Sequence, residues 1–267
     1  MIGLAFPNIS PEIFSIGFFS VRWYSMAYLL GILFAWFMVK RNVKKYDWGL
    51  TDENLSDLAF YATMGMVAGG RLGYVLFYGG EPNPFWENPA LILQLWKGGM
   101  SFHGGIAGVI FAVLWYSYKI KYPFLKIMDI IAPFAPIGLF LGRLTNFIND
   151  ELWGRVTTVP WAVRFPNGGY LPRHPSQLYE AMLEGVVMFL ILNILWNIKW
   201  TREKTGFISG TFAILYTLFR VIVEQYREPD AHIGFVLGSM TMGQLLSVPL
   251  ILAGIWAIYK SFKTKPE

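Results

Sequence analysis

Four arginines lie inside long apolar stretches of the chain, where a charged side chain is costly and therefore indicates a function: Arg22, Arg71, Arg143 and Arg220. Arg143 is followed by Asn146 and Asp150, at spacings of i, i+3 and i+7. That spacing puts a guanidinium, an amide and a carboxylate on one face of a helix. Such a face cannot point at lipid tails, so we expect it to line a polar interior.

A second group of polar residues has helical spacing further along the chain. Tyr216, Arg220 and Glu224 follow one another at i, i+4 and i+8. Arg220 and Glu224 can therefore form an ion pair within one helix. Such a pair serves either to hold helices together or to build a site, and the pattern favours neither reading.

His103 lies in the glycine-rich segment from Ser101 to Gly108. An imidazole can accept a proton near neutral pH, and a helix start offers backbone N–H groups to an anion. A lone histidine is more often structural, but the nearby arginines favour a role in chemistry. Arg71 follows Gly69 and Gly70, small residues that admit either a neighbouring helix or a lipid headgroup.

The composition is that of a membrane protein. Of 267 residues, 55% are hydrophobic and only 15% are charged, and the aromatic residues include 11 Trp and 14 Tyr. These values exclude a soluble enzyme, a disordered tail and a DNA-binding domain, so we expect no nucleic-acid partner. The chain has no cysteine and three histidines, so we expect no metal centre.

Seven segments are long and apolar enough to cross a bilayer as helices. They are Ile16 to Val39, Leu55 to Tyr78, Met100 to Tyr118, Ile127 to Ile148, Gln177 to Ile198, Phe207 to Gln225 and Ser239 to Tyr259. We therefore expect an all-α integral membrane protein with seven transmembrane helices, forming one polytopic domain over residues 1–267.

The basic residues predict the orientation of these helices. Of 22 Lys and Arg, 13 follow the first, third, fifth and seventh segments, and 5 lie in the alternate connections. Because basic loops stay in the cytoplasm, we expect the N-terminus outside and the C-terminus inside. The connection from about residue 150 to 176 alternates aromatic residues with Gly, Pro and Arg, and we expect it to form a small outer cap.

Two classes of function fit these features. Buried arginines can bind an anionic headgroup for chemistry, or they can line the path of a transported anion. An odd number of spans and the lack of an inverted repeat mildly disfavour transport.

The chain resembles the bacterial prolipoprotein diacylglyceryl transferases over nearly its whole length. The resemblance rests on six segments: Arg22–Tyr24, Gly69–Tyr74, Met100–Gly105, Gly142–Arg155, Arg173–Glu180 and Arg220–Asp230. It implies an enzyme of the bacterial inner membrane that transfers the diacylglyceryl group of phosphatidylglycerol to the lipobox cysteine of prolipoproteins. The implied product is a thioether, glycerol 1-phosphate is released, and neither cofactor nor metal takes part. The connection from Val156 to Pro172 is shorter than in many family members.

The resemblance also implies which residues form the site. Arg143 and Arg220 are the main contacts to the phosphate and the transition state. The other implied catalytic residues are His103, Asn146, Glu151 and Tyr24, and the other implied substrate-binding residues are Gly154, Tyr216, Arg71, Glu180 and Glu224.

Overall fold

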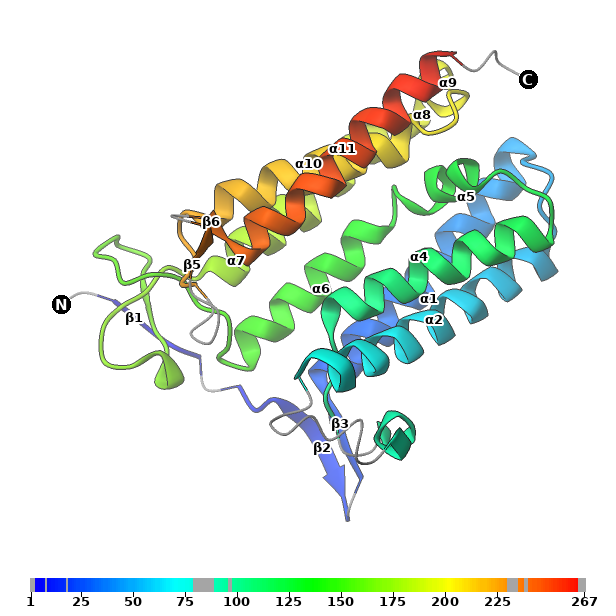
Figure 1. The fold of residues 1–267 in the computed structure, drawn as a ribbon. Coiled ribbons are helices and arrows are strands. Elements are labelled where there is room, and N and C mark those ends of the chain that lie inside the picture. The colour runs from blue at the N-terminus through cyan, green and yellow to red at the C-terminus, as the bar shows by residue number, and fades with distance from the viewer. Residues whose placement is uncertain are drawn as a thin grey trace. The chain divides into compact units, whose positions relative to one another are not determined.

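The computed structural model describes residues 3–7, 9–17, 19–78, 89–95, 98–229, 235–237 and 240–263 (Figure 1). Helices dominate it. The chain forms two compact units, one made of residues 1–38 and 128–267 and the other of residues 39–127. Both divisions fall inside a helix, the first in α1 (Trp23–Tyr46) and the second in α5 (Phe124–Ile131).

The first expected span begins seven residues later than predicted. Strands β2 (Glu12–Ile16) and β3 (Phe19–Arg22) form an antiparallel hairpin before α1. Gly17, at a φ of 61°, provides the left-handed backbone conformation at the turn. Arg22 therefore lies in a strand and not in a helix, where its exposed side chain pairs with Glu12 at 3.3 Å.

Helices α2 (Asp52–Tyr78) and α4 (Phe102–Lys119) lie in the unit of residues 39–127 and match the second and third expected spans. They pack on each other through glycines. A Cβ on Gly69 would come within 2.8 Å of the Gly108 Cα, and one on Gly73 within 2.9 Å of the Gly104 Cα. Only glycine permits this backbone approach. A 3₁₀ helix, η1 (Pro89–Leu93), lies in the connection between the two helices.

The fourth expected span is broken. Helix α5 ends at Ile131, α6 (Ala135–Ile148) begins four residues later, and the two are bent by 53°. Pro133 lies within this break and Pro136 in the first turn of α6. Proline has no N–H to donate and clashes with the preceding turn, so a continuous helix from Ile127 to Ile148 cannot form here.

The fifth expected span is one helical run with an unusual middle. It comprises α7 (Ser176–Glu180), the π-helical segment η4 (Ala181–Val187) and α8 (Met188–Asn197). A short helix α9 (Lys199–Arg202) follows it.

The last two long helices run side by side (Figure 1). They are α10 (Phe207–Glu224) and α11 (Met242–Lys263), and Ser239, where the seventh span was expected to begin, lies outside the described residues. A Cβ on Gly210 would come within 2.7 Å of the Gly254 carbonyl oxygen, so this pair of glycines allows close packing.

Residues 150–176, the segment expected to form a small outer cap, contain short strands and turns, and their place outside the membrane stays a prediction. Strand β1 (Leu4–Ala5) pairs in parallel with β4 (Val163–Arg164), and the 3₁₀ turn η3 (Pro166–Gly168) follows. A second two-stranded pair, β5 (Phe235–Leu237) with β6 (Met240–Thr241), leads into α11.

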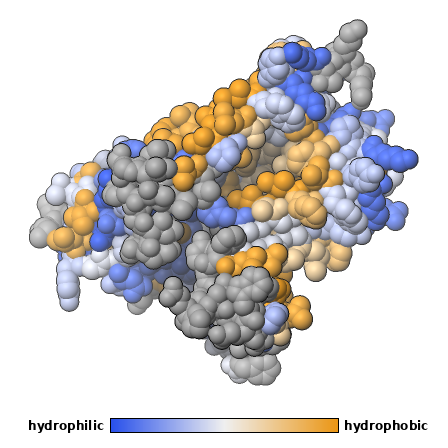
Figure 2. All heavy atoms as spheres, in the orientation of Figure 1, coloured by the Kyte–Doolittle hydropathy of each residue, from blue (hydrophilic) through white to orange (hydrophobic). Residues whose placement is uncertain are grey.

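The structure supports the membrane character that the composition predicts. Among the described residues, four helices are long and apolar enough to cross a bilayer, or five if the bent pair α5–α6 counts as one span. The four are Trp23–Tyr46, Ser176–Asn197, Phe207–Glu224 and Gly243–Lys263. Hydrophobic residues, in orange, cover much of the visible surface over α10 and α11 in Figure 2. Leu252 and Trp256 of α11 are among the exposed large hydrophobic residues.

Candidate active site

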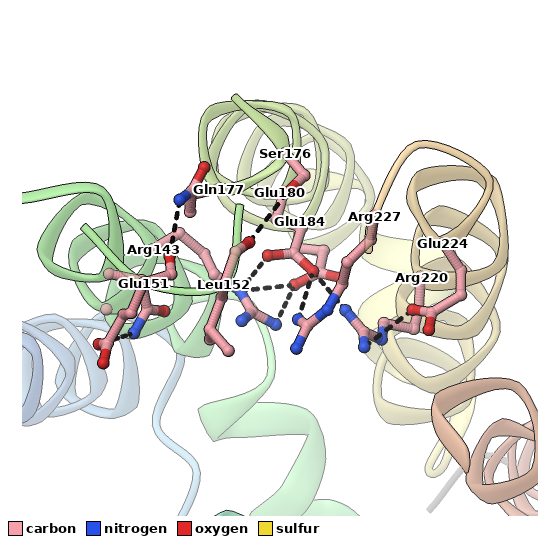
Figure 3. Close-up of polar contacts among 12 residues, drawn as sticks. Arg143, Glu151, Leu152, Ser176, Gln177, Glu180, Glu184, Arg220, Glu224 and Arg227 are labelled. Atoms are coloured by element: carbon pink, nitrogen blue, oxygen red, sulfur yellow. Dashed lines mark hydrogen bonds and ion pairs between the residues drawn. The ribbon is translucent and has the colours of Figure 1, made fainter. Parts of the chain in front are cut away.

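Glu180, at the end of α7, is the centre of a buried group of charges (Figure 3). Its side chain has no exposed surface, and its two carboxylate oxygens contact three guanidinium groups. Oε2 lies 3.3 Å from Arg143 Nε, and Oε1 contacts Arg220 and Arg227. We call these residues and their partners the arginine–glutamate cluster; its members are Arg143, Glu180, Glu184, Arg220, Glu224 and Arg227.

Arg143, on α6, is held by two carboxylates. Besides Glu180, its Nη2 donates to Glu184 Oε2 at 3.2 Å and its Nε to the same oxygen at 3.4 Å. The Arg143 side chain keeps 13% of its surface exposed, whereas that of Glu184 is fully buried. Two carboxylates therefore hold the Arg143 guanidinium group in place, while part of the side chain remains exposed.

Arg220 and Glu224 form the ion pair that their spacing predicts. Arg220 Nη2 lies 2.9 Å from Glu224 Oε2, and Arg220 Nη1 donates to Glu180. The pair is therefore part of a site that joins α7 and α10. A Cβ on Gly243 of α11 would lie only 2.9 Å from Arg220 Nη2, so the glycine leaves room for the guanidinium group.

The π-helical segment η4 explains how Glu180 and Glu184 reach the same arginine. Residues four apart face the same side of a helical turn. Gly185, within η4, lies so close to α6 that a Cβ would meet the Cβ of Phe140 at 2.6 Å. The close contact between Gly185 and Phe140 brings Glu184 next to Arg143, which lies one turn after Phe140 on α6. Single π-helical turns inside a helix are common at functional sites.

A second set of polar contacts continues from α6 beyond Arg143. Asn146 Nδ2 donates to Glu151 Oε1 at 2.8 Å, and the buried Gln177 Nε2 donates to the Glu151 carbonyl at 2.6 Å. Tyr24, at the start of α1, lies near enough to interact electrostatically with both Glu151 and Arg143. These contacts place Asn146, Glu151 and Tyr24 beside the cluster.

Tyr216 and Gly154, two further residues expected in the site, also lie near the cluster. Tyr216, one turn before Arg220 on α10, interacts electrostatically with Arg143, Arg220 and both buried glutamates of η4 and α7. Gly154 donates its N–H to the His174 carbonyl at 2.8 Å, and a Cβ there would meet the Tyr226 carbonyl at 2.5 Å. The backbone packing alone therefore requires glycine at position 154.

Asp150 does not share a face with Arg143, which corrects the expectation from spacing. Helix α6 ends at Ile148, and Asp150 has a φ of 53°, so its side chain turns away to accept the Asn167 N–H at 2.6 Å. Burial raises the pKa of this carboxyl, and the hydrogen bond from Asn167 opposes the rise.

Arg71 and His103 belong to the other unit, residues 39–127. The buried Arg71 donates to backbone carbonyls of Leu91, Gln94, Gly98 and Gly99, which organises the segment around η1. The expected contact of Arg71 with the substrate stays a prediction, and the hydrogen bonds of Arg71 to these carbonyls do not support it. His103 is exposed near the start of α4, whose Gly104 N–H is capped by Ser101 Oγ at 3.2 Å.

Sequence reasoning missed two members of the cluster, Glu184 and Arg227. Glu184 follows Glu180 by four residues inside an apolar stretch, the same signal that singled out the arginines. Arg227 was counted with an outer connection, although it lies three residues after Glu224 and is buried. Its Nη1 reaches Glu180 Oε1 at 3.4 Å.

Three guanidinium groups on a shared carboxylate make a site for an anion. Arginine binds a phosphate through two parallel N–H bonds, and its interaction is strengthened where water is excluded. Within the described residues, no three His, Asp or Glu side chains are grouped to hold a metal ion. The three guanidinium groups can stabilise negative charge on a phosphate through hydrogen bonds.

Comparison with known proteins gives one consistent result. A family model described as prolipoprotein diacylglyceryl transferase matches residues 11–260. A relative from Rickettsia felis is 51% identical over 258 residues, covering 97% of this chain and 99% of its own. One from Vibrio parahaemolyticus is 51% identical over 260 residues, covering 97% and 93%. One from Pseudomonas paraeruginosa is 49% identical over 269 residues, covering 99% of each. All three are named phosphatidylglycerol–prolipoprotein diacylglyceryl transferase.

Proposed function

The chain belongs to the prolipoprotein diacylglyceryl transferase family, and we propose on that basis that it carries out the reaction for which its relatives are named. It is a transferase that moves the diacylglyceryl group of phosphatidylglycerol to the thiol of a prolipoprotein's lipobox cysteine. The products are a thioether and glycerol 1-phosphate. This is the first step of lipoprotein maturation.

The arginine–glutamate cluster is the observation in the structure that supports this chemistry. Arg143 and Arg220 keep 13% and 12% of their side chains exposed, while Glu180 between them is fully buried. We assign the two guanidinium groups to the phosphodiester of the lipid. The carboxylates paired with them fix the orientation of both groups before the lipid arrives, which lowers the cost of binding.

The reaction is a displacement at a glycerol carbon. The thiolate sulfur forms a bond to that carbon as the bond to the phosphate oxygen breaks, and the electron pair stays on the departing glycerol phosphate. Negative charge on the phosphate therefore grows in the transition state. Fixed guanidinium donors stabilise that charge more than they stabilise the ground state, which accelerates the reaction.

The thiol must lose its proton before it attacks, because its unperturbed pKa is about 8.5. We assign the proton-accepting role to His103, which stands at a glycine-rich helix start, while Tyr24, Asn146, Glu151, Gly154 and Tyr216 complete the surroundings of the phosphate. A His103→Gln variant with the wild-type rate and pH profile would contradict the assignment to His103.

We also propose seven spans in the inner membrane, forming one polytopic domain with the N-terminus outside. Helices occupy all seven expected segments, the division into two units falls within α1 and α5, and basic residues gather in alternate connections. Because the chain has no cysteine, single cysteines can report its orientation. We expect an impermeant maleimide to label Tyr170→Cys in intact cells and Lys121→Cys only after permeabilisation. The reverse pattern would overturn the orientation.

Incubation of the purified protein with phosphatidylglycerol and a lipobox peptide tests the function. We expect glycerol phosphate to be released in step with thioether formation on the peptide. A control peptide with serine in place of the cysteine should give neither product. Uptake of an anion into vesicles without any transfer would instead favour a transporter.

A further inference from the structure

The arginine–glutamate cluster contains equal numbers of opposite charges. Three guanidinium groups and three carboxylates are joined in one network of ion pairs, among them pairs at 2.9, 3.2, 3.3 and 3.4 Å. With all six groups ionised, the cluster has no net charge. A phosphodiester that enters it brings one negative charge into a site shielded from water, where an uncompensated charge is strongly disfavoured. One added proton would restore the balance.

The three carboxylates differ in how well they are compensated. Glu180 contacts three arginines, and Glu224 contacts Arg220 while keeping 5% of its side chain exposed. Glu184 is fully buried and contacts Arg143 alone. Each of the three carboxylates has one buried oxygen without a hydrogen-bond partner: Glu180 Oε2, Glu184 Oε1 and Glu224 Oε2. Glu180 Oε2 and Glu224 Oε2 lie 3.3 and 2.9 Å from a guanidinium nitrogen, whereas the ion pair of Glu184 is made by its other oxygen, Oε2. Glu184 is therefore the carboxylate at which negative charge is most costly, and a proton there turns an unsatisfied acceptor into a donor.

Among the ionisable groups of the cluster, Glu184 is the one that we expect to accept a proton. Arg143 faces it from α6 and Glu180 from α7, while Tyr216 and Arg220 act on it from α10. Glu224 and Arg227 complete the network through Arg220 and Glu180. The neighbouring helix α8 has no titratable residue. A phosphate shared by Arg143 and Arg220 would weaken the attraction of both guanidinium groups for the ionised Glu184.

We propose that binding of the lipid phosphodiester to the cluster is coupled to the uptake of one proton, and that Glu184 takes up this proton. The inference rests on the proposed function, since it assumes that the cluster holds the phosphate of phosphatidylglycerol. Glu184 thus acts as a positioning residue: ionised, it holds Arg143 in the empty site, and protonated, it releases the guanidinium group to the lipid.

Calorimetry counts the protons directly. Dihexanoyl phosphatidylglycerol is titrated into the purified protein at one pH in two buffers with different ionisation enthalpies, and the difference in observed heat gives the protons taken up per bound lipid. We expect a value close to one for the wild type. For Glu184→Gln, whose neutral amide copies the protonated carboxyl, we expect lipid binding with a value close to zero. Glu203→Gln, a matched change at an exposed carboxylate outside the cluster, should keep a value close to one.

Several results would overturn the proposal. They are a wild type that binds no lipid or takes up no proton, a Glu184→Gln variant that still takes up one, and a folded Glu184→Gln variant that cannot bind the lipid. Loss of uptake in Glu203→Gln would also overturn it, because that carboxylate lies outside the cluster. If Glu184→Gln fails to fold, Glu184→Asp serves instead, since it keeps a titratable carboxyl and should keep the uptake. Normal proton uptake without transfer to a lipobox peptide would count against the proposed function alone.

Discussion

Arg220 shows why the type of cation matters in this site. Its Nη2 reaches Glu224 at 2.9 Å while its Nη1 donates to Glu180, so one planar group spans two carboxylates. Lysine has a single ammonium group and cannot make both contacts while also binding a phosphate through two parallel bonds.

We therefore expect Arg220→Lys to lower the rate of transfer by about 10- to 100-fold, as for the loss of one hydrogen bond to a charged group. Steady-state assays with phosphatidylglycerol and a lipobox peptide measure this rate. Arg164→Lys, at an exposed arginine of the cap, is the matched control and should keep the wild-type rate. Equal rates for the two variants would show that Arg220 only holds helices together.

His174, in the cap, links stability to pH. Burial lowers the pKa of its imidazole below the usual value of 6.5, and its Nδ1 lies 3.0 Å from the Tyr179 hydroxyl. Because the unfolded chain binds the proton more tightly, this contribution to stability is present above about pH 6.5 and is lost as the pH falls. Thermal unfolding in detergent should show a smaller loss of stability between pH 7.5 and pH 5.5 for His174→Gln than for the wild type. An equal loss of stability in the wild type and in His174→Gln would show that His174 does not cause the pH dependence.

At the residue scale, the sequence predicted which side chains to consider better than it predicted their contacts. Arg143, Arg220, Glu180 and Glu224 were all candidates, and the structure joins them in one network. The spacing rule failed for Asp150 because the helix ends at Ile148, a boundary that spacing does not reveal. Glu184 could have been found, since a charge in an apolar span is costly whatever its sign.

Helix α10 depends on a carboxylate from another element. Its N-cap, Gly206, has no side chain to satisfy the first N–H groups. Asp129 of α5 replaces a cap: it accepts the Gly206 N–H at 2.5 Å and the Ser209 N–H at 2.7 Å. The Asp129 side chain is buried, so these bonds have no water to replace them.

We expect Asp129→Ala to destabilise the protein by about 1–3 kcal/mol, the cost of buried donors left without a partner. Thermal unfolding of the purified protein measures the change. Asp129→Asn keeps one acceptor oxygen and should lose less. Equal stability of the wild type and Asp129→Ala would show that the α10 start does not need this cap.

At the element scale, hydropathy located the helices but not their irregularities. Hydropathy is averaged over a window of residues. It therefore predicted one continuous span through the break at Pro133, and it predicted that the first helix includes part of the hairpin that ends at Arg22. Both features had local signals, a proline pair and a turn glycine. The π-helical segment had none, because its course depends on the contact between Gly185 and Phe140, which lie far apart in the sequence.

For the whole molecule, composition predicted the membrane character, the resemblance of six segments predicted the family, and the structure supplies the balance of charges in the site. The arginines are neutralised by glutamates from α7, η4 and α10 before any substrate is bound. Removal of one arginine therefore leaves a buried carboxylate without its partner, which can destabilise the fold as well as the site. A test of the central assignment must separate these two effects.

The transfer rate of Arg143→Ala combined with Glu184→Gln is the most direct measurement. The second change removes the charge that Arg143 would leave unpaired. We predict that this double variant is inserted and folded, that Glu184→Gln alone still transfers, and that the double variant loses at least about 100-fold in rate, as when one oxyanion donor is removed. A folded double variant that forms the thioether at nearly the rate of Glu184→Gln would contradict the assignment of Arg143 to the lipid phosphate.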